Sequence, residues 1–161
     1  MKTTPSFTRR TLLGGAATLI AGLAAAPGFA QMTLAPAVTA EKVTLFKDPN
    51  CGCCQGYADY LKTNGFEVEV IPTQDLGQMN DAAGIPADFA GCHLFTIGNY
   101  AFSGHIPVAS LGKFLTERPA MIGLTVPGMP MGSPGMGGEK MGPLEVFALQ
   151  AGQAPTVYAV E

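Results

Sequence analysis

Charged residues are scarce in this chain of 161 residues. They make up 13% of the sequence, whereas hydrophobic residues make up 47%. That balance excludes a disordered polyelectrolyte and a basic nucleic-acid-binding protein. Residues 1–30 contain three cations and no acid, so the rest of the chain carries six cations against twelve acids, a net charge of −6. Phosphate backbones and anionic membranes repel such a domain, and we expect no nucleic-acid partner.

The sequence also lacks the motifs of several common enzyme classes. It contains no phosphate-binding P-loop, no dinucleotide-binding glycine motif, no catalytic triad signature and no paired-carboxylate motif. No internal repeat is visible either. Conventional hydrolase chemistry and nicotinamide-dependent chemistry therefore have no support in the sequence.

The longest apolar run is too short to span a bilayer. Leu12–Ala26 has about fifteen small and apolar residues, whereas a membrane helix needs roughly 20. The run follows a cationic start and ends in Ala26-Pro27-Gly28-Phe29-Ala30, which is typical of an export signal. Arg9-Arg10 also resembles a twin-arginine signal. We predict that residues 1–30 are a signal peptide cleaved near Ala30. The mature chain is then periplasmic, without stable membrane insertion; a non-cleaved anchor is the alternative.

The remaining sequence predicts a linker at 31–41 and one small α/β domain at 42–161. Apolar periodicity and turn residues predict strands at 43–46, 66–71, 93–97, 100–102, 144–149 and 156–160, and helices at 51–64, 75–83 and 107–118. The initial strand–helix–strand order implies a parallel crossover, and the later strand pairs add antiparallel edges. This order fits a thioredoxin-like mixed sheet flanked by helices on both faces, with a Met/Gly/Pro-rich loop over 123–143 near the C-terminus.

Three of the four cysteines are crowded into Cys51-Gly52-Cys53-Cys54, and Cys92 follows about forty residues later. In an oxidising compartment two disulfides are the default use of four cysteines. A bridge between the adjacent Cys53 and Cys54 is strained, however, which makes the cluster a poor structural staple. The cluster also coincides with a predicted helix start, where the helix dipole lowers thiol pKa values and favours the thiolate. A thiolate is both a nucleophile and a metal ligand.

Two chemical interpretations follow for this cluster. Cys51 and Cys54 form a C-x-x-C pair like the redox dithiol of thioredoxin-like oxidoreductases, with Cys92 as a resolving thiol. A third thiol inside that pair, Cys53, invites scrambled bridges, and this favours metal binding. Cu(I) prefers sulfur ligands and lets one sulfur bridge two ions. Four Cu(I) ions neutralise four thiolates, which matters because buried net charge is costly. Zinc is a third option.

The copper interpretation requires Cys92 to fold against the other three cysteines; alternatively, Cys92 is a buried core thiol and His93 a surface residue. His93 and His105 are further candidate ligands, since imidazole also binds Cu(II) well. Met129, Met131 and Met136 lie in Gly/Pro-rich chain without helical spacing. Their thioethers are candidates to capture or shield Cu(I), and a flexible apolar loop packing over the sheet is the alternative.

Four motifs occur together in this order: Cys51-Gly52-Cys53-Cys54, Cys92-His93, Gly104-His105-Ile106-Pro107 and the Val-Pro-Gly-Met-Pro-Met-Gly-Ser-Pro-Gly-Met segment at 126–136. In this combination the chain resembles the CopG-like family of periplasmic copper-resistance proteins, long catalogued as a domain of unknown function. The resemblance covers about residues 42–161.

The resemblance implies a thioredoxin-like fold and a role in copper homeostasis, including interconversion of Cu(I) and Cu(II). It also implies a multinuclear Cu(I) cluster bound by the four cysteines, with His93 and His105 as neighbours that ligate or tune the copper. The expected partners are copper ions and other periplasmic copper-handling proteins. These features favour a binding protein over an enzyme; an enzymatic role would be copper or thiol oxidoreduction.

Overall fold

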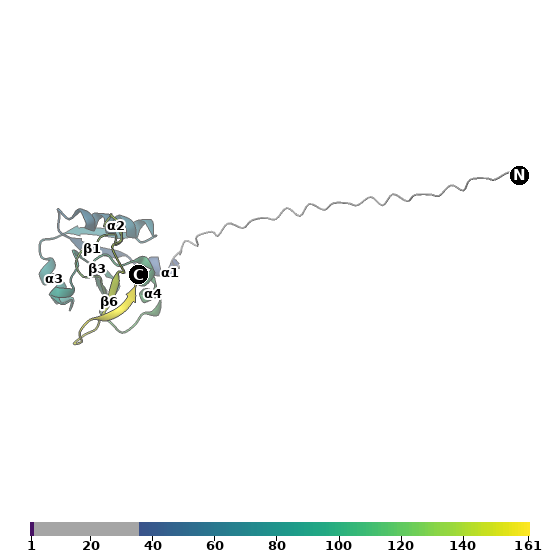
Figure 1. Ribbon diagram of the computed structural model, residues 1–161. Helices are drawn as coiled ribbons and strands as arrows, with labels where there is room; N and C mark the ends of the chain where they lie inside the picture. Colours follow the sequence, from purple (N-terminus) through teal and green to yellow (C-terminus); the bar gives the residue numbers. More distant parts are fainter. Residues whose placement is uncertain (2–35) are drawn as a thin grey trace. The chain divides into compact units, whose positions relative to one another are not determined.

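The computed structural model describes Met1 and residues 36–161 (Figure 1). The predicted signal peptide therefore lies outside the described residues, apart from Met1. The elements in chain order are α1 (Pro36–Thr39), β1 (Val43–Lys47), α2 (Gly52–Thr63), β2 (Val68–Pro72), α3 (Leu76–Ala82), the 3-10 turn η1 (Ala87–Phe89), β3 (His93–Ile97), β4 (Tyr100–Ser103), α4 (Val108–Glu117), β5 (Gly123–Thr125), β6 (Glu145–Leu149) and β7 (Thr156–Val160).

The strands form one mixed sheet of seven strands in the order β2-β1-β3-β4-β5-β6-β7. β1 and β2 are parallel and are connected through α2, as the strand–helix–strand pattern predicts. β3 lies antiparallel to both β1 and β4, β5 lies parallel to β4, and β6 and β7 continue antiparallel. The prediction of a mixed α/β domain is confirmed.

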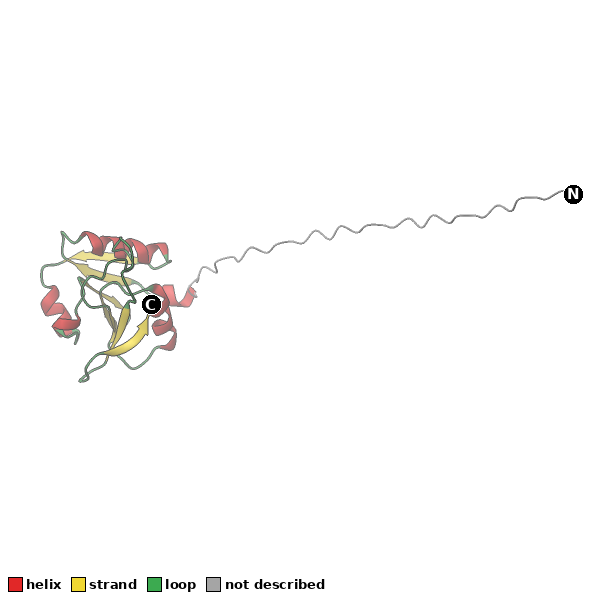
Figure 2. Ribbon diagram, in the orientation of Figure 1, coloured by secondary structure: helices red, strands yellow, loops and turns green. Residues whose placement is uncertain are grey.

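Helices lie on both faces of the sheet (Figure 2), and the side chains of each strand point alternately to one face and the other. Val43 and Leu45 of β1 are fully buried in the large core cluster that also contains the apolar side chains of α2 and α4. The intervening Phe46 packs on the opposite face, in a smaller cluster with Leu94 of β3 and residues of α3. Successive side chains of a strand point to opposite faces, so α2 and α4 cover one face and α3 covers the other.

The structure differs from the sequence prediction in three short elements. β5 lies inside the segment predicted as a loop; a strand of three residues is too short to show periodicity, and its Gly123 packs directly on the Ala101 carbonyl. The turn η1 carries no distinctive pattern. α1 lies within the predicted linker, where Val38 joins the main core.

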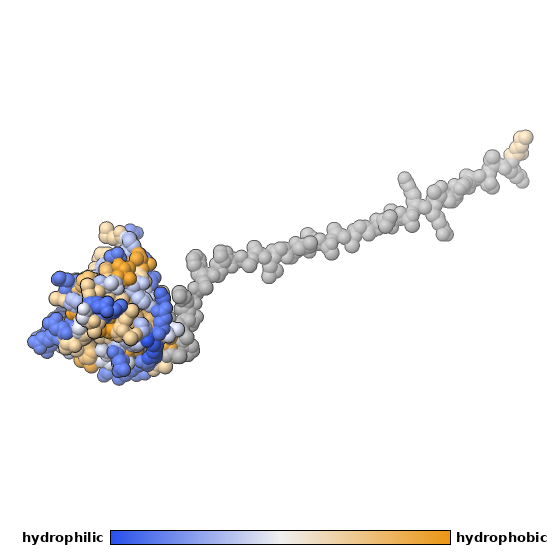
Figure 3. Space-filling view, turned by 90° about the horizontal axis from the view of Figure 1, so that it is seen from below, coloured by the Kyte–Doolittle hydropathy of each residue, from blue (hydrophilic) through white to orange (hydrophobic). Residues whose placement is uncertain are grey.

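In the described part of the chain, no helix is both long and apolar enough to cross a bilayer. On the face seen in Figure 3, hydrophobic residues lie among hydrophilic ones. The exposed large hydrophobic side chains within residues 36–161 are Met129, Met131, Met141, Val157 and Val160. Three of these five belong to the Met/Gly/Pro-rich loop.

Candidate metal centre

The two cysteine-bearing segments meet where β1 ends and β3 begins. After Lys47 the chain makes a turn in which the Asn50 amide donates to the Asp48 carboxylate at 2.7 Å and the Cys51 amide donates to the Asp48 carbonyl at 3.0 Å. This turn places Cys51 at the N-cap of α2. In the antiparallel register His93 is opposite Lys47, so Cys92, one residue earlier, lies beside the start of α2.

Two glycines, Gly91 and Gly104, allow the segment that carries His105 to approach the cysteines. Gly104 has φ +77°, and a Cβ there would lie 2.1 Å from the Val126 carbonyl oxygen. A Cβ on Gly91 would lie 2.3 Å from the Cα of Gly104. Only glycine tolerates both the left-handed conformation and this close backbone packing. The segment after β4 is thereby held against the residue that precedes Cys92.

All four cysteine sulfurs lie within 4.8 Å of one another. Cys51 and Cys54 form a disulfide, and Cys53 and Cys92 are free thiols. Each free thiol lies beside a different sulfur of the disulfide: Cys53 is 3.4 Å from Cys51, and Cys92 is 3.5 Å from Cys54. Cys53 and Cys92 are 3.7 Å apart. The structure thus brings together the four sulfurs that the copper interpretation requires.

Cys92 also belongs to a second ligand group, with His93 and His105. Its sulfur is 3.4 Å from His93 Nδ1 and 3.1 Å from His105 Nε2. His105 Nδ1 lies 2.6 Å from the Pro134 carbonyl oxygen, which only accepts hydrogen bonds. Nδ1 therefore carries the proton, and the Nε2 lone pair faces Cys92. Such a second partner orients a histidine as a metal ligand.

Both histidines are fully buried, so the alternative that His93 is a surface residue is wrong. The Nε2 atom of His93 has no hydrogen-bond partner among the described residues. Leaving a buried polar atom unpaired costs about 1–3 kcal/mol, and a metal ion is one way to satisfy it. The donor set, four sulfurs and two imidazoles, therefore fits a soft or borderline metal ion.

Burial sets the protonation states of this centre in the absence of metal. It lowers the pKa of His93 to about 3, with His105 adding to the effect, and it also lowers the pKa of His105. Both imidazoles are therefore neutral at pH 7 and can donate a lone pair. Burial and the neighbouring Cys53 raise the pKa of Cys92 to about 12. The Cys92 thiol then donates its hydrogen to His105 Nε2, and a bound metal would replace that proton.

Tyr57 of α2 packs against both histidines. The Tyr57 ring centroid lies 4.7 Å from that of His93 and 5.3 Å from that of His105. The Tyr57 hydroxyl donates to the Ile106 carbonyl, and the Tyr60 hydroxyl accepts the Val108 amide. Both tyrosines lie within the helix predicted at 51–64, but nothing in the sequence shows that the loop after β4 docks on them.

The Met/Gly/Pro-rich loop reaches the centre through its backbone. Pro134 accepts the hydrogen bond of His105, and Gly135 packs so closely on Gly56 of α2 that a Cβ on Gly56 would lie 2.4 Å from its oxygen. The methionines themselves are more exposed. Met129 and Met131 are 55% and 49% exposed, and Met136 is half-buried.

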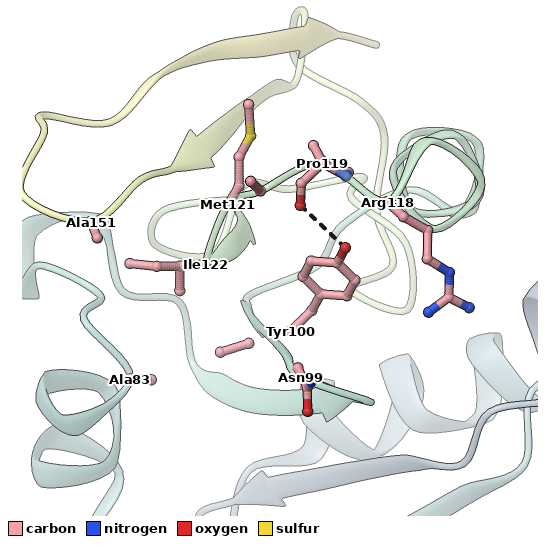
Figure 4. Close-up of a pocket in the computed structure, with 10 residues that line it drawn as sticks. Ala83, Asn99, Tyr100, Arg118, Pro119, Met121, Ile122 and Ala151 are labelled. Carbon is pink, nitrogen blue, oxygen red and sulfur yellow. Dashed lines mark hydrogen bonds between the residues drawn. The ribbon is translucent and has the colours of Figure 1, made fainter.

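A cavity lies at the other end of β4, away from the cysteines. It has a volume of about 840 Å³, and Tyr100 and Arg118 are among the residues that line it. The Tyr100 hydroxyl donates to the Pro119 carbonyl inside it (Figure 4). No cysteine or histidine lines this cavity, so the cysteine centre, and not this cavity, is the candidate metal-binding site.

The chain is similar to two solved structures. Two structures named copper resistance protein copG, Form 1 and Form 2, each match with a TM-score of 0.70 and 33% sequence identity. The matches cover 75% of this chain and 97–98% of theirs. The chain belongs to the CopG family. A family model described as a protein of unknown function, DUF411, matches residues 89–136, a span that includes Cys92, His93 and His105. No curated protein sequence matches the chain.

Proposed function

We propose that this CopG-family protein binds copper and holds it as a multinuclear Cu(I) cluster on the thiolates of Cys51, Cys53, Cys54 and Cys92. The observation that carries the proposal is the meeting of four sulfurs, from two segments far apart in the sequence, within 4.8 Å. The name of the two matching structures, copper resistance protein, supports copper as the metal. The disulfide must be reduced before all four sulfurs can bind.

The chemistry of the centre favours Cu(I) over other metals. Thiolates are soft ligands, and crowded sulfurs suit an ion that accepts few ligands and allows bridging. Several monovalent ions also offset the charge of four partly buried thiolates better than one divalent ion does. The adjacent group of Cys92, His93 and His105 adds imidazole, which suits Cu(II). We therefore infer that the protein holds both Cu(I) and Cu(II), with Cys92 common to both ligand groups. Their interconversion would move one electron per copper ion to or from an external one-electron redox partner.

The Met/Gly/Pro-rich loop is proposed to cover the centre and to offer Met129, Met131 and Met136 to incoming Cu(I). Exposed thioethers are weak, soft ligands that can pass the ion to thiolates. We further propose that residues 1–30 direct export and that the domain works in the periplasm. Its partners there would be other copper-handling proteins.

Copper and thiols per chain, measured on anaerobically purified and reduced protein, test the proposal. We expect more than one Cu(I) per chain, with all four thiols protected from alkylation once copper is bound. Cys53→Ser should greatly weaken Cu(I) binding. A single tightly bound Zn(II) that Cu(I) does not displace would overturn the proposal.

A second candidate function is thiol–disulfide exchange, which the Cys51–Cys54 disulfide specifically favours. Cys92, 3.5 Å from Cys54, is placed to act as the resolving thiol. The same variants separate the two functions. If Cys53→Ser keeps its copper stoichiometry, the four-cysteine cluster is not the copper site; if Cys51→Ser also abolishes reduction of a disulfide substrate, thiol–disulfide exchange is the function of the cysteines.

A further inference from the structure

The Met/Gly/Pro-rich loop folds on itself between β5 and β6. The Gly132 amide donates a hydrogen bond to the Gly137 carbonyl at 3.0 Å. A Cβ on Gly132 would lie 2.5 Å from the backbone nitrogen and from the Cα of Lys140. Two limbs of the loop, residues 130–133 and 140–144, therefore pack backbone against backbone at this point. These backbone contacts set where the side chains of the two limbs lie.

A cavity of about 290 Å³ lies between the two limbs, and two thioethers line it. They belong to Met131, which precedes Gly132, and to Met141, which follows Lys140. The Met131 side chain lies across the loop, because a Cβ on Gly138 would be 2.6 Å from its Cε methyl carbon. Met131 and Met141 are 49% and 86% exposed. Single exposed apolar side chains are common, but two thioethers around one cavity are a specific arrangement.

The chemistry of this lining favours a soft, monovalent ion. No cysteine, histidine, aspartate or glutamate is among the residues that line the cavity, so Zn(II) and Cu(II) find none of their usual ligands there. A thioether is a soft ligand that suits Cu(I). Lys140 also lines the cavity, and its ammonium repels a divalent ion about twice as strongly as a monovalent one. The three rotatable bonds of a methionine side chain allow both sulfurs to turn towards one ion.

We propose that Met131 and Met141 form a second copper site, a thioether site that binds Cu(I) but neither Cu(II) nor Zn(II). Binding needs no electron transfer, because Cu(I) only exchanges the ligands it arrives with for two thioethers. Ser133 also lines the cavity, and the next residue, Pro134, accepts the hydrogen bond of His105 at 2.6 Å. The site is thus joined to the cysteine centre through the chain and serves as its intake site. In that role it rests on the proposed function.

The test follows each methionine methyl group separately, by NMR of the full chain labelled with ¹³C at the methionine methyl groups. The protein is the Cys53→Ser/Cys92→Ser variant, which keeps the Cys51–Cys54 disulfide and has no free thiol to compete for the ion. Signals are assigned with single Met→Leu substitutions. Cu(I) is added anaerobically with ascorbate, and Zn(II) and Cu(II) are added to separate samples.

We expect the methyl signals of Met131 and Met141 to move together on addition of Cu(I), with one dissociation constant. Met131→Leu should weaken the response of Met141 by about tenfold or more, and Met141→Leu should do the same to Met131, because a second ligand on the same loop binds intramolecularly. Met121→Leu changes a partly buried methionine that packs against the core, and this matched control should leave both responses unchanged. Zn(II) and Cu(II) should affect neither signal.

An unchanged response of Met141 in Met131→Leu would mean that the two thioethers bind independently, and the proposed site would be wrong. A response of either signal to Zn(II) would contradict the selectivity. If the cysteine variant unfolds, the unchanged chain is titrated instead, with its reduced cysteines already saturated with Cu(I), and the same two signals decide.

The thioether site and the proposed function can fail separately. If Met131 and Met141 respond together but the reduced cysteines of the unchanged chain bind no Cu(I), the thioether site stands and the proposed function fails. If the cysteines bind several Cu(I) ions while the two methyl signals stay in place, the proposed function stands and the thioether site is overturned.

Discussion

Cys92 is the residue that joins the two ligand groups. Its sulfur is 3.5 Å from Cys54 and 3.1 Å from His105 Nε2, whereas the Cys53 sulfur lies beside those of Cys51 and Cys92 and belongs to the four-cysteine group alone. Losing Cys92 therefore removes a ligand from both groups, and losing Cys53 removes one from the sulfur group alone. The two cysteines, though both free thiols, should have separable roles.

Substituting each of these cysteines by serine tests that separation. Cys92→Ser should lose most Cu(I) and also the Cu(II) signal expected from thiolate–imidazole coordination. Cys53→Ser should lose most Cu(I) but keep that Cu(II) signal, because Cys92, His93 and His105 remain. Metal content and electron paramagnetic resonance of the oxidised protein measure the two effects. A Cu(II) signal that survives in Cys92→Ser would exclude Cys92 as its ligand.

The buried histidines predict an acid-sensitive fold. Below pH 6.5 the unfolded chain takes up a proton on His93, whereas burial lowers its folded pKa to about 3, so the folded protein stays unprotonated. The contribution of His93 to the free energy of unfolding is complete above pH 6.5. It is lost as the pH falls towards 3, by up to about 1.4 kcal/mol per pH unit. His105 acts in the same direction. The sequence contains no other histidine, so few other side chains titrate between pH 5 and 6.5.

Urea unfolding of the metal-free, disulfide-bonded protein at several pH values between 5 and 7 measures this effect. We expect the free energy of unfolding to fall with decreasing pH, and His93→Gln to show a shallower dependence. Gln is a suitable control because it cannot be protonated in this range. An unchanged slope in His93→Gln would mean that His93 is not buried in its neutral form.

At the scale of elements, the Met/Gly/Pro-rich loop and α2 are joined by a contact that only glycine allows. A Cβ on Gly56 would meet the Gly135 oxygen at 2.4 Å, whereas a Cβ on Gly77 of α3 would meet nothing within 4 Å. Alanine is favoured over glycine in a helix by up to about 1 kcal/mol. The two helix glycines should therefore respond to the same substitution in opposite ways.

We expect Gly77→Ala to raise the free energy of unfolding by up to about 1 kcal/mol. Gly56→Ala should instead push the loop away from α2, remove the Pro134 partner of His105 and weaken copper binding several-fold. Limited proteolysis of residues 129–141 and Cu(I) competition measure the two consequences. Equal stabilisation in both variants, with unchanged proteolysis, would show that the loop does not pack on Gly56.

The sequence predicts most helices and strands because their apolar periods are long enough to read. The alternation along β1 and the i, i+3, i+4 spacing in α2 are clear, but three residues of β5 show no period. Local patterns could not establish that Cys92 meets Cys51–Cys54, because this contact depends on strand register, which is a tertiary property. The strand predicted at 43–46 stops one residue short of Lys47, which continues the alternation of Val43 and Leu45 onto the buried face.

On the scale of the whole molecule, the centre joins segments that are far apart in the chain. Cys51–Cys54 begins α2, Cys92 precedes β3, and His105 lies in the loop before α4 and contacts Pro134. Only the folded chain brings these segments together, so a metal ion held by all of them binds the folded chain and not the unfolded one. Copper binding should therefore be coupled to the global stability of the domain.

Thermal unfolding of the reduced protein with and without Cu(I) measures this coupling. At a free Cu(I) concentration 1,000 times the dissociation constant, linkage adds about 4 kcal/mol. In a domain of this size that raises the unfolding temperature by roughly 10 °C. The Cys53→Ser/Cys92→Ser double variant, which keeps Cys51 and Cys54, controls for copper bound by a local pair and should show only a small rise. An equal rise in the double variant would place the copper at the C-x-x-C pair alone, because the coupling would then not need the sulfur of Cys92.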